Sequence, residues 1–540
     1  MKRALVLAAA AALALPSIAR ADGYGYADIG RELLMRRFAS ARERSQAALA
    51  GYLRFRGAGL YNLDLDHGLT PSGDPLFFVP VDDPTAQTLY TADTRLRTDL
   101  TIYPRGVGAL INVRVDVLDN LALGSTPEGK PATGRAPTPA ASPGQNPPVD
   151  ALRIKRAFAE VLTPFGVLAT GRMGAHWGLG MMANGGDCDD CNFGDSADRI
   201  AFVTPIAGHV WAASYDFTAS GPVARRKDEA RVIDIEPTDN VHTLTFAVMN
   251  VRSDEARERR RRAGRTTLEY GALLSRRWQD NDIPADYLPT AVPVNIDAGQ
   301  VVRRGYHATA ADGWMRLTTG RLHIAAELAY LGARVDQPST IPGVTFDRPI
   351  TSDQLGFAMK SGYGTDEDRA AAGLDFGLAS GDSAPGFGAF PAPNATAPQP
   401  GDLDGPQAAL PGDNTVDNFR FHPDYHIDRI LFREIIGTVT DAIYLRPHAR
   451  FHLWRIGRYS RVVASLAVIA SWAAKPESTP GGQRFLGVEI DPGLRYETRD
   501  GFSLSLEHAV FFPGNGFNRR VDDRPVNSAQ LFRARLMYRF

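Results

Sequence analysis

Polar and apolar residues alternate with a period of two along most of the chain after residue 50. In one such segment the polar positions are Arg95, Arg97 and Asp99, and the neighbouring apolar positions include Leu96 and Leu100. Successive side chains of a β-strand point to opposite faces, so this alternation predicts strands with one polar and one apolar face. Soluble sandwiches also contain such strands, and the architecture therefore has to be decided by a second criterion.

The spacing of the segments supplies that criterion. The pattern predicts 18 strands, at 51–64, 93–103, 107–118, 150–162, 165–173, 197–205, 208–219, 239–251, 265–278, 301–317, 321–335, 350–363, 368–380, 437–455, 458–473, 484–499, 501–512 and 529–540. Short turns such as 104–106 alternate with long connections such as 119–149 and 381–436. Outer-membrane barrels have short periplasmic turns, long external loops and an even number of strands, so the sequence predicts an all-β transmembrane antiparallel β-barrel.

One turn departs from this rhythm. Residues 252–264 lie on the expected periplasmic side, but the turn is long and carries five arginines between residues 257 and 262. It is either a solvated turn or a docking point for a periplasmic partner.

The last predicted strand, 529–540, has the same two faces. Its apolar face comprises Phe532, Leu536, Tyr538 and Phe540, and its polar face comprises Arg533, Arg535 and Arg539. Aromatic side chains gather at the membrane interfaces of such barrels. The segment resembles the C-terminal strand that the barrel insertion machinery of bacterial outer membranes reads, so this machinery and the membrane lipid are expected partners.

The N-terminus has the pattern of a processing signal. Basic Lys2 and Arg3 precede the apolar run 4–18, and a small-x-small cleavage site follows at 19–21. This predicts a signal peptide over 1–21 and export of the mature chain. Helical spacing over 29–49 predicts a periplasmic helical segment within 22–50, ahead of a barrel over 51–540.

Composition narrows the functional classes. The net charge of -1 gives no electrostatic argument for nucleic acid, which is not an expected partner. The 52 glycines and 37 prolines suit many turns better than long helices. Segments 127–148 and 387–414 are rich in such residues, which predicts mobile external loops, one of them folding inward over the pore.

Charged residues on the polar faces would line the lumen. The predicted lumen residues are Arg54, Arg56, Arg95, Arg97, Arg114, Arg446, Arg450, Glu489, Asp491, Arg495, Glu507, Arg533 and Arg535. An excess of guanidinium groups favours anionic solutes, because the fork matches carboxylate and phosphate. The alternative is that opposite charges pair across neighbouring strands and only stabilise the wall.

The densest local motif lies between residues 172 and 198. Cys188 and Cys191 suit a small disulfide that stiffens an external loop of an exported protein. Alternatively, Asp187, Asp189 and Asp195 offer hard oxygen ligands to Ca²⁺, although their spacing is not that of an EF-hand. A redox or zinc site is disfavoured, since there is no second cysteine pair.

An enzyme is not predicted. His176, His209, His448 and His452 could each join a serine and an acid, but 11 histidines make such sets easy to find by chance. The sequence contains no Gly-x-Ser-x-Gly elbow, no His-Glu-x-x-His and no phosphate-binding loop. No cofactor is expected beyond the calcium considered above.

Several segments between residues 350 and 540 resemble alginate-export-type outer-membrane porins. The resemblance is carried by 378–382, 421–425, 432–437, 485–491 with Tyr496, and 511–514. It implies an 18-stranded monomeric barrel with an arginine-rich, anion-selective lumen and an acidic saccharide as solute.

Three functions remain open from the sequence. The first is an outer-membrane channel for diffusion or export of small or polymeric polar solutes, with a preference for anions. The second is a plugged, surface-exposed barrel with a role in adhesion or assembly. The third is a soluble, secreted, β-rich glycan-binding protein.

Overall fold

The computed structural model describes residues 24–31, 33, 45–73, 77, 86–105, 108–123, 152–225, 232–284, 298–391, 398–456, 460–520 and 525–540. The predicted signal peptide, the segment 127–148 and most of the predicted helix over 29–49 lie outside these residues.

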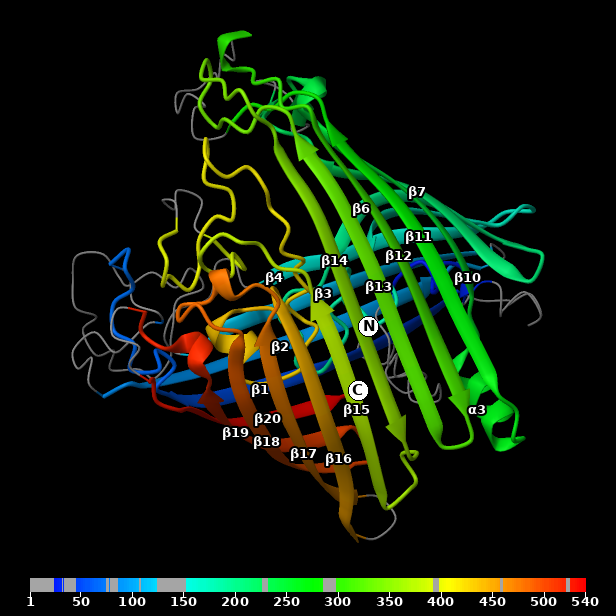
Figure 1. Ribbon diagram of the computed structural model, residues 1–540. Coiled ribbons are helices and arrows are strands. Elements are labelled where there is room, and N and C mark those ends of the chain that lie inside the picture. Colours follow the sequence, from blue (N-terminus) through cyan, green and yellow to red (C-terminus); the bar gives the residue numbers. More distant parts are fainter. Residues whose placement is uncertain are drawn as a thin grey trace, which may run out of the picture.

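The described chain forms one closed antiparallel barrel of 18 strands, confirming the predicted fold class (Figure 1). The strands are β1 Gln46–Tyr61, β2 Thr88–Tyr103, β3 Ala109–Ala122, β4 Leu152–Leu162, β5 Val167–Gly174, β6 Ser196–Ile206, β7 His209–Ala219, β10 Val241–Asn250, β11 Thr267–Gln279, β12 Tyr306–Thr319, β13 Leu322–Val335, β14 Ile350–Tyr363, β15 Ala370–Ala379, β16 Ala442–Ile456, β17 Ser460–Ala473, β18 Phe485–Thr498, β19 Phe502–Pro513 and β20 Ala529–Arg539. Each strand pairs with the next one in this order, and β1 pairs with β20.

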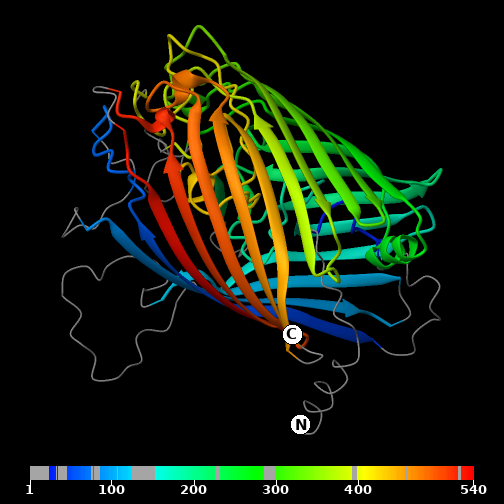
Figure 2. The ribbon, with the colours of Figure 1, turned by 60° about the horizontal axis from the view of Figure 1, so that its bottom comes forward.

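The junction between β1 and β20 closes the barrel at the C-terminus of the chain. Gly51 and Phe540 exchange two backbone hydrogen bonds, each 3.0 Å long, beyond the last residue of β20. Figure 2 shows the C-terminus at the end of the barrel where the short turns lie. Closure leaves the sheet no edge, which is the condition for a β-structure to cross lipid.

The first strand begins at Gln46, five residues before the expected start at residue 51. Residues 46–50 pair with 99–103 of β2, in register from Gln46 opposite Tyr103. The helical spacing assigned to 29–49 therefore ends on residues that belong to the barrel wall. The strand prediction missed these residues because Gln-Ala-Ala-Leu-Ala shows no alternation of polar and apolar side chains, and they were assigned to the helix instead.

The two faces of the wall have the predicted polarity. Outward-facing Phe55, Leu274 and Phe532 are 43%, 53% and 56% exposed. Their inward-facing neighbours Arg54 and Arg533 are 0% and 3% exposed. An apolar outer surface of this kind is stable only in contact with lipid, because apolar area exposed to water is unfavourable.

Helical elements are short and lie in the connections. The basic turn 252–264 contains α3 (Asp254–Arg262), which is capped by Ser253 and whose Glu258 pairs with Arg261 and Arg262. The other helical elements of the described residues are single turns at Pro237–Asp239, Ala298–Gln300, Leu431–Ile435, Pro476–Ser478 and Asn515–Phe517. None of the described helices is both long and apolar enough to cross a membrane. A small hairpin of β8 (Val223–Arg225) and β9 (Val232–Asp234) extends one long loop.

Two of the long connections fold into the barrel rather than away from it (Figures 1 and 2). We call residues 175–195, between β5 and β6, the disulfide loop, and residues 380–441, between β15 and β16, the long inner loop. The long inner loop packs its buried Phe421, Ile430 and Leu431 against the inner wall. Part of the predicted external segment 387–414 belongs to this loop, and its Asp402 binds the Ser72 hydroxyl at 2.6 Å.

Candidate functional site in the barrel lumen

The described N-terminal residues, 24–31, lie inside the barrel. Tyr26 places its hydroxyl 2.6 Å from the Ser214 hydroxyl on β7, and the Tyr24 hydroxyl donates to Glu160 on β4. The Gly30 N–H donates to the same Glu160 carboxylate at 2.9 Å. These contacts anchor the segment to the inner wall, whereas the sequence predicted a periplasmic position for it.

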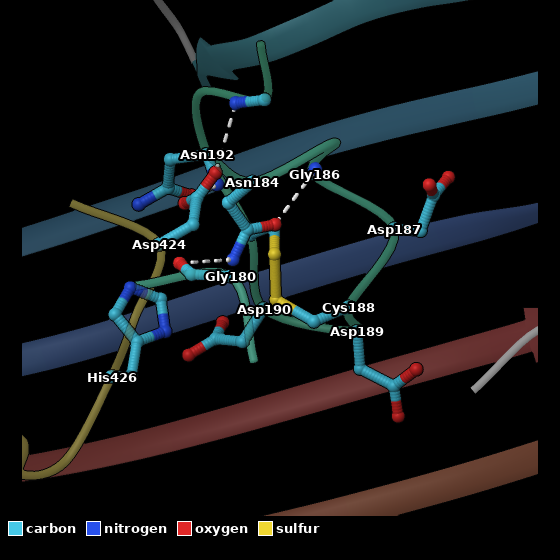
Figure 3. The surroundings of a disulfide bond; sticks show 12 residues. Gly180, Asn184, Gly186, Asp187, Cys188, Asp189, Asp190, Asn192, Asp424 and His426 are labelled. Carbon is cyan, nitrogen blue, oxygen red and sulfur yellow. Dashed lines mark hydrogen bonds between the residues drawn. A yellow bond between two sulfur atoms is a disulfide. The ribbon is translucent and has the colours of Figure 1, made fainter. Parts of the chain in front are cut away.

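The disulfide loop occupies the lumen beside this segment. Cys188 and Cys191 form a disulfide, and the three carboxylates of Asp187, Asp189 and Asp190 around it point in different directions (Figure 3). The loop was expected outside the barrel. It lies inside because the wall offers its backbone and its carboxylates charged partners on every side.

Arginines of the wall hold the main chain of the loop. Arg54 on β1 donates to the carbonyl oxygens of Asp189 and Cys191, both at 3.2 Å. Arg95 on β2 donates to the Cys191 carbonyl at 2.9 Å and to the Asn192 carbonyl at 3.1 Å. Both arginine side chains are fully buried. These guanidinium groups are therefore used for structure, and a solute has no access to them.

Asp187 and Asp189 are neutralised by different parts of the wall. Arg156 lies 2.8 Å from the Asp187 carboxylate, and Arg114 contacts it from the next strand. Asp189 pairs with Arg539, and with Arg495 at 3.4 Å. Burial alone would raise the pKa of both carboxyls, but the arginine charges outweigh it and hold each pKa below its usual range.

The carboxylate of Asp190 is surrounded by several arginine side chains. Its carboxylate lies 2.5 Å from Arg433, 2.9 Å from Arg56, 3.0 Å from Arg535 and 3.6 Å from Arg533. Burial would raise the pKa of Asp190, but these four charges hold it well below its usual range. Asp190 thus stays ionised and joins β1, β20 and the long inner loop.

The proposed calcium ligands do not converge. Asp187 and Asp189 face different arginines, and Asp195 lies 3.4 Å from His422 Nε2. Within the described part of the chain, no three acidic, histidine or cysteine side chains are arranged to hold a metal ion. Asp187 and Asp189 pair with arginines in the described structure, and calcium binding by these three carboxylates stays a prediction.

Two carboxylates anchor the loop by its N–H groups. Asp424 of the long inner loop accepts from the backbone of Asn192 at 2.6 Å, Phe193 at 3.0 Å and Gly194 at 2.9 Å. Glu327 on β13 accepts from the N–H groups of residues 179, 181 and 182. Neither residue was among the predicted site residues, since nothing in the local sequence marks the distant N–H groups that they bind.

The predicted lumen residues face inward, and each of the arginines among them pairs with a carboxylate. The ten are Arg54, Arg56, Arg95, Arg97, Arg114, Arg446, Arg450, Arg495, Arg533 and Arg535. Of the predicted acids, Glu507 pairs with the arginines of β20, and Glu489 accepts from the N–H groups of residues 429–431. Asp491 is buried beside Glu489. The arginines of this set are therefore compensated mainly by carboxylates outside it, such as Asp116, Asp189 and Asp375.

Two cavities lie along the inner wall of the barrel. The loop-end cavity, about 670 Å³, is lined by Tyr26, Trp177, Thr243, Thr245, Ser275 and Arg277, among other residues. The turn-end cavity, about 700 Å³, is lined by Thr318, His323, Gly362, His448 and Arg450, with Glu258 and Arg261 of α3 at its rim. Both cavities border β12 and β13, so they lie on one side of the lumen at opposite ends.

Three arginines line the loop-end cavity together with Asp195, Asp198 and Asp216. Arg172 pairs with Asp198 and Arg199 with Asp216, whereas the third arginine, Arg277, was not among the predicted site residues. Its Nε donates to the Thr243 hydroxyl at 3.0 Å, and none of the carboxylates in the described ranges pairs with it. The neighbouring Arg276 lies on the outer face and donates to Thr309. Because two arginines are consecutive here, polar and apolar residues do not alternate, and the sequence pattern does not show which of the two faces the lumen.

No protein-family model and no curated protein matches the chain. Solved structures of similar shape include OccK11 (OpdR) of Pseudomonas aeruginosa, at 12% identity over 93% of this chain and 99% of that chain, with a TM-score of 0.45. OpdK of Pseudomonas aeruginosa with vanillate matches at 11% identity, 91% and 98% coverage, and a TM-score of 0.43. OmpT of Vibrio cholerae matches at 10% identity, 92% and 99% coverage, and a TM-score of 0.36.

The closed 18-strand sheet with its apolar outer face defines an outer-membrane β-barrel. Within that class, the chain is a barrel whose lumen holds the disulfide loop, the long inner loop and residues 24–31. Membership of the alginate-export superfamily stays a prediction from the segments between 350 and 540.

Proposed function

We propose that this protein is a passive channel of the outer membrane for small polar solutes. The proposal is carried by the two polar cavities of about 670 and 700 Å³ on the β12–β13 side of the lumen, one at each end of the barrel. An 18-strand barrel is wide enough to leave such space after its loops fold inward. Transport needs no covalent step, so the function is not enzymatic.

The filling of the lumen favours small solutes over a polymer. The disulfide loop and the long inner loop are fixed by buried ion pairs and by hydrophobic packing, and together they occupy the arginine-rich side. A polymer chain would need a continuous wide passage through this region. We therefore propose diffusion of small molecules and not export of a polysaccharide.

A preference for anions is part of the proposal, and it rests on Arg277. The arginines predicted to attract anions are compensated, whereas Arg277 faces the loop-end cavity with a hydroxyl as its partner. An uncompensated cation beside a water-filled path raises the local concentration of anions. Hydroxyl groups of Thr243, Thr245 and Ser275 in the same wall suit a polar solute.

The test is ion conduction in planar bilayers. We expect the folded protein to conduct ions. In Arg277→Gln we expect the reversal potential in a KCl gradient to shift in the direction of higher cation selectivity. Arg276→Gln is the matched control, because the same charge is removed from the outer face one residue away. A folded barrel without current would refute the channel, and equal reversal potentials in both variants would refute the role of Arg277.

The second candidate is a plugged barrel with a role in adhesion or assembly. It is favoured by the two hydrophobic clusters that loop residues form inside the barrel, which include Tyr24, Trp177, Phe421 and Ile430. Absence of current together with correct folding would favour this candidate.

A further inference from the structure

Residues 177–182 of the disulfide loop, which we call the strap, border the loop-end cavity on the side of β12 and β13. Trp177 and Met182 of the strap line the loop-end cavity. On β12 this cavity reaches Ala310, and the turn-end cavity begins at Thr318. The wall between these positions carries Asp312 on β12 and Glu327 on β13, both facing inward.

The strap is fixed to this wall by hydrogen bonds to the two carboxyls. Trp177 Nε1 donates to Asp312 Oδ1 at 2.8 Å. The Glu327 carboxylate accepts from the Leu179 N–H, from Met182 N–H at 3.3 Å and from Met181 N–H at 3.5 Å. Glu327 is 1% exposed, so these bonds form away from bulk water, where they are strong.

The backbone of the strap lies so close to the Glu327 carboxylate that the contact requires a glycine in the strap. Gly178 has a φ of +56°, and a Cβ at this position would lie 2.5 Å from Glu327 Oε2. Trp177 also packs edge-on against Trp314 of β12, with ring centroids 6.3 Å apart. The strap is therefore seated on the wall by a glycine that leaves room for the carboxylate and by a tryptophan that fills the neighbouring space.

We propose that the strap is the gate of the channel and that Glu327 is the residue that positions it in the closed state. This rests on the proposed channel function. A solute that leaves the loop-end cavity along β12 and β13 meets the strap before it reaches the turn-end cavity. Release of the N–H groups from Glu327 would leave the strap held by two remaining hydrogen bonds, Trp177 Nε1 to Asp312 and the His422 N–H to the Met181 carbonyl, so the strap could move off the wall more readily.

The strap is connected to a firm base. Its Met181 carbonyl accepts from the His422 N–H of the long inner loop at 2.7 Å. Beyond the strap, Asp424 and the wall arginines fix residues 186–194. Movement of the strap thus requires the Met181 carbonyl to leave the His422 N–H, while the rest of the disulfide loop stays in place.

The experiment compares single-channel recordings of the wild type, Glu327→Gln and Gly178→Ala. Glutamine keeps the volume but presents a neutral group to three N–H donors, and alanine pushes the strap away from the carboxylate. Because each hydrogen bond to a charged group is strong, we expect the closed-to-open ratio to fall about tenfold in either variant. The control is Asp353→Asn, which changes a carboxylate that accepts from Tyr330 on the outer face.

A second readout separates gating from a general loss of structure. In Thr318→Cys, the new thiol in the turn-end cavity is labelled by a charged thiol reagent added from the loop end; the native Cys188 and Cys191 do not react because they form a disulfide. We expect labelling to accelerate about tenfold in the Glu327→Gln background. Labelling from the turn end should stay unchanged, and so should heat-modifiable migration on gels.

The outcomes are distinct. No current from the folded wild type would refute the channel and the gate together. Current from the wild type with unchanged gating and labelling in Glu327→Gln and Gly178→Ala would refute the gate and leave the channel standing. Changed gating in Asp353→Asn as well would show that the effect is not specific to Glu327.

Discussion

Asp424 and Asn192 are 232 residues apart in the chain, yet the Asp424 carboxylate accepts a 2.6 Å hydrogen bond from the Asn192 N–H. Phe193 and Gly194 donate to the same carboxylate. This side chain therefore joins the two loops that fill the lumen, and neither loop is held in place by its own residues alone.

Removal of this carboxylate is expected to loosen the disulfide loop. Asp424→Ala leaves three partly buried N–H donors without their charged acceptor, so we expect the protein to lose about 2 kcal/mol of stability. Urea unfolding monitored by heat-modifiable gel migration measures the loss. The control is Asp347→Ala, which changes an exposed carboxylate in another long loop. Equal unfolding of the two variants would contradict the role of Asp424.

Asp190 is expected to be the most costly carboxylate of the disulfide loop to remove. Asp190→Asn leaves Arg433, Arg535 and Arg56 close together without their shared anion. A buried charge without its partner costs about 3–5 kcal/mol, so the unfolding midpoint in urea should fall strongly. Addition of Arg433→Gln to this variant should recover part of the loss, because one of the repelling charges is then absent.

A strictly additive loss in the double variant would contradict this account of Asp190. Asp189→Asn provides a comparison, because Asp189 has two arginine partners and is more exposed. Its effect on the urea midpoint should be smaller.

Asp441, directly before β16, should make stability depend on pH. Burial raises the pKa of this carboxyl to about 7, although Ser478 and the Lys475 N–H donate to it. Its pKa in the unfolded chain is about 3.9, so its contribution to stability is complete below that pH and is lost as the pH rises through 7. We expect Asp441→Asn to reduce the fall in thermal midpoint between about pH 5 and about pH 8.

The control for this pH dependence is Asp347→Asn, which should leave the profile of the wild type unchanged. An identical slope in Asp441→Asn and the wild type would show that other groups cause the dependence.

The closing strand pair gives a prediction about assembly. Phe540 is 43% exposed on the outer face and exchanges two backbone hydrogen bonds with Gly51. We expect Phe540→Ser to lower the yield of folded barrel in the outer membrane several-fold, because the aromatic face is the signal proposed for the insertion machinery. The measurement is the fraction of heat-modifiable protein in membranes. Tyr363→Ser, also on an exposed aromatic, is the control.

The strands could be predicted because the barrel wall separates two environments. Lipid on one side and charged loops on the other impose a period of two, so all 18 strands were found. The start of β1 was missed because residues 46–50 are nearly all alanine and leucine. The helix α3 was missed because it is a single exposed, arginine-rich segment within a turn, with no apolar face to reveal it.

The inward position of the loops could not be predicted in this way. It depends on pairs such as Asp190 with Arg433 and Glu327 with Leu179, which join segments far apart in the sequence. The arginines of the wall were correctly placed on the inner face. Their carboxylate partners could not be predicted from the sequence. The wall arginines, which suggested anion binding, form ion pairs with carboxylates of the protein.

The wall arginines Arg54 and Arg95 bind carbonyl oxygens of residues 189–192. Every amino acid supplies such an oxygen, whatever its side chain. Side chains of the disulfide loop that form no ion pair with the wall can therefore be exchanged while these attachments persist. The wall can therefore hold loops of different sequence through the same backbone contacts. Solute preference can change with the side chains of the loop while the attachment of the loop stays the same.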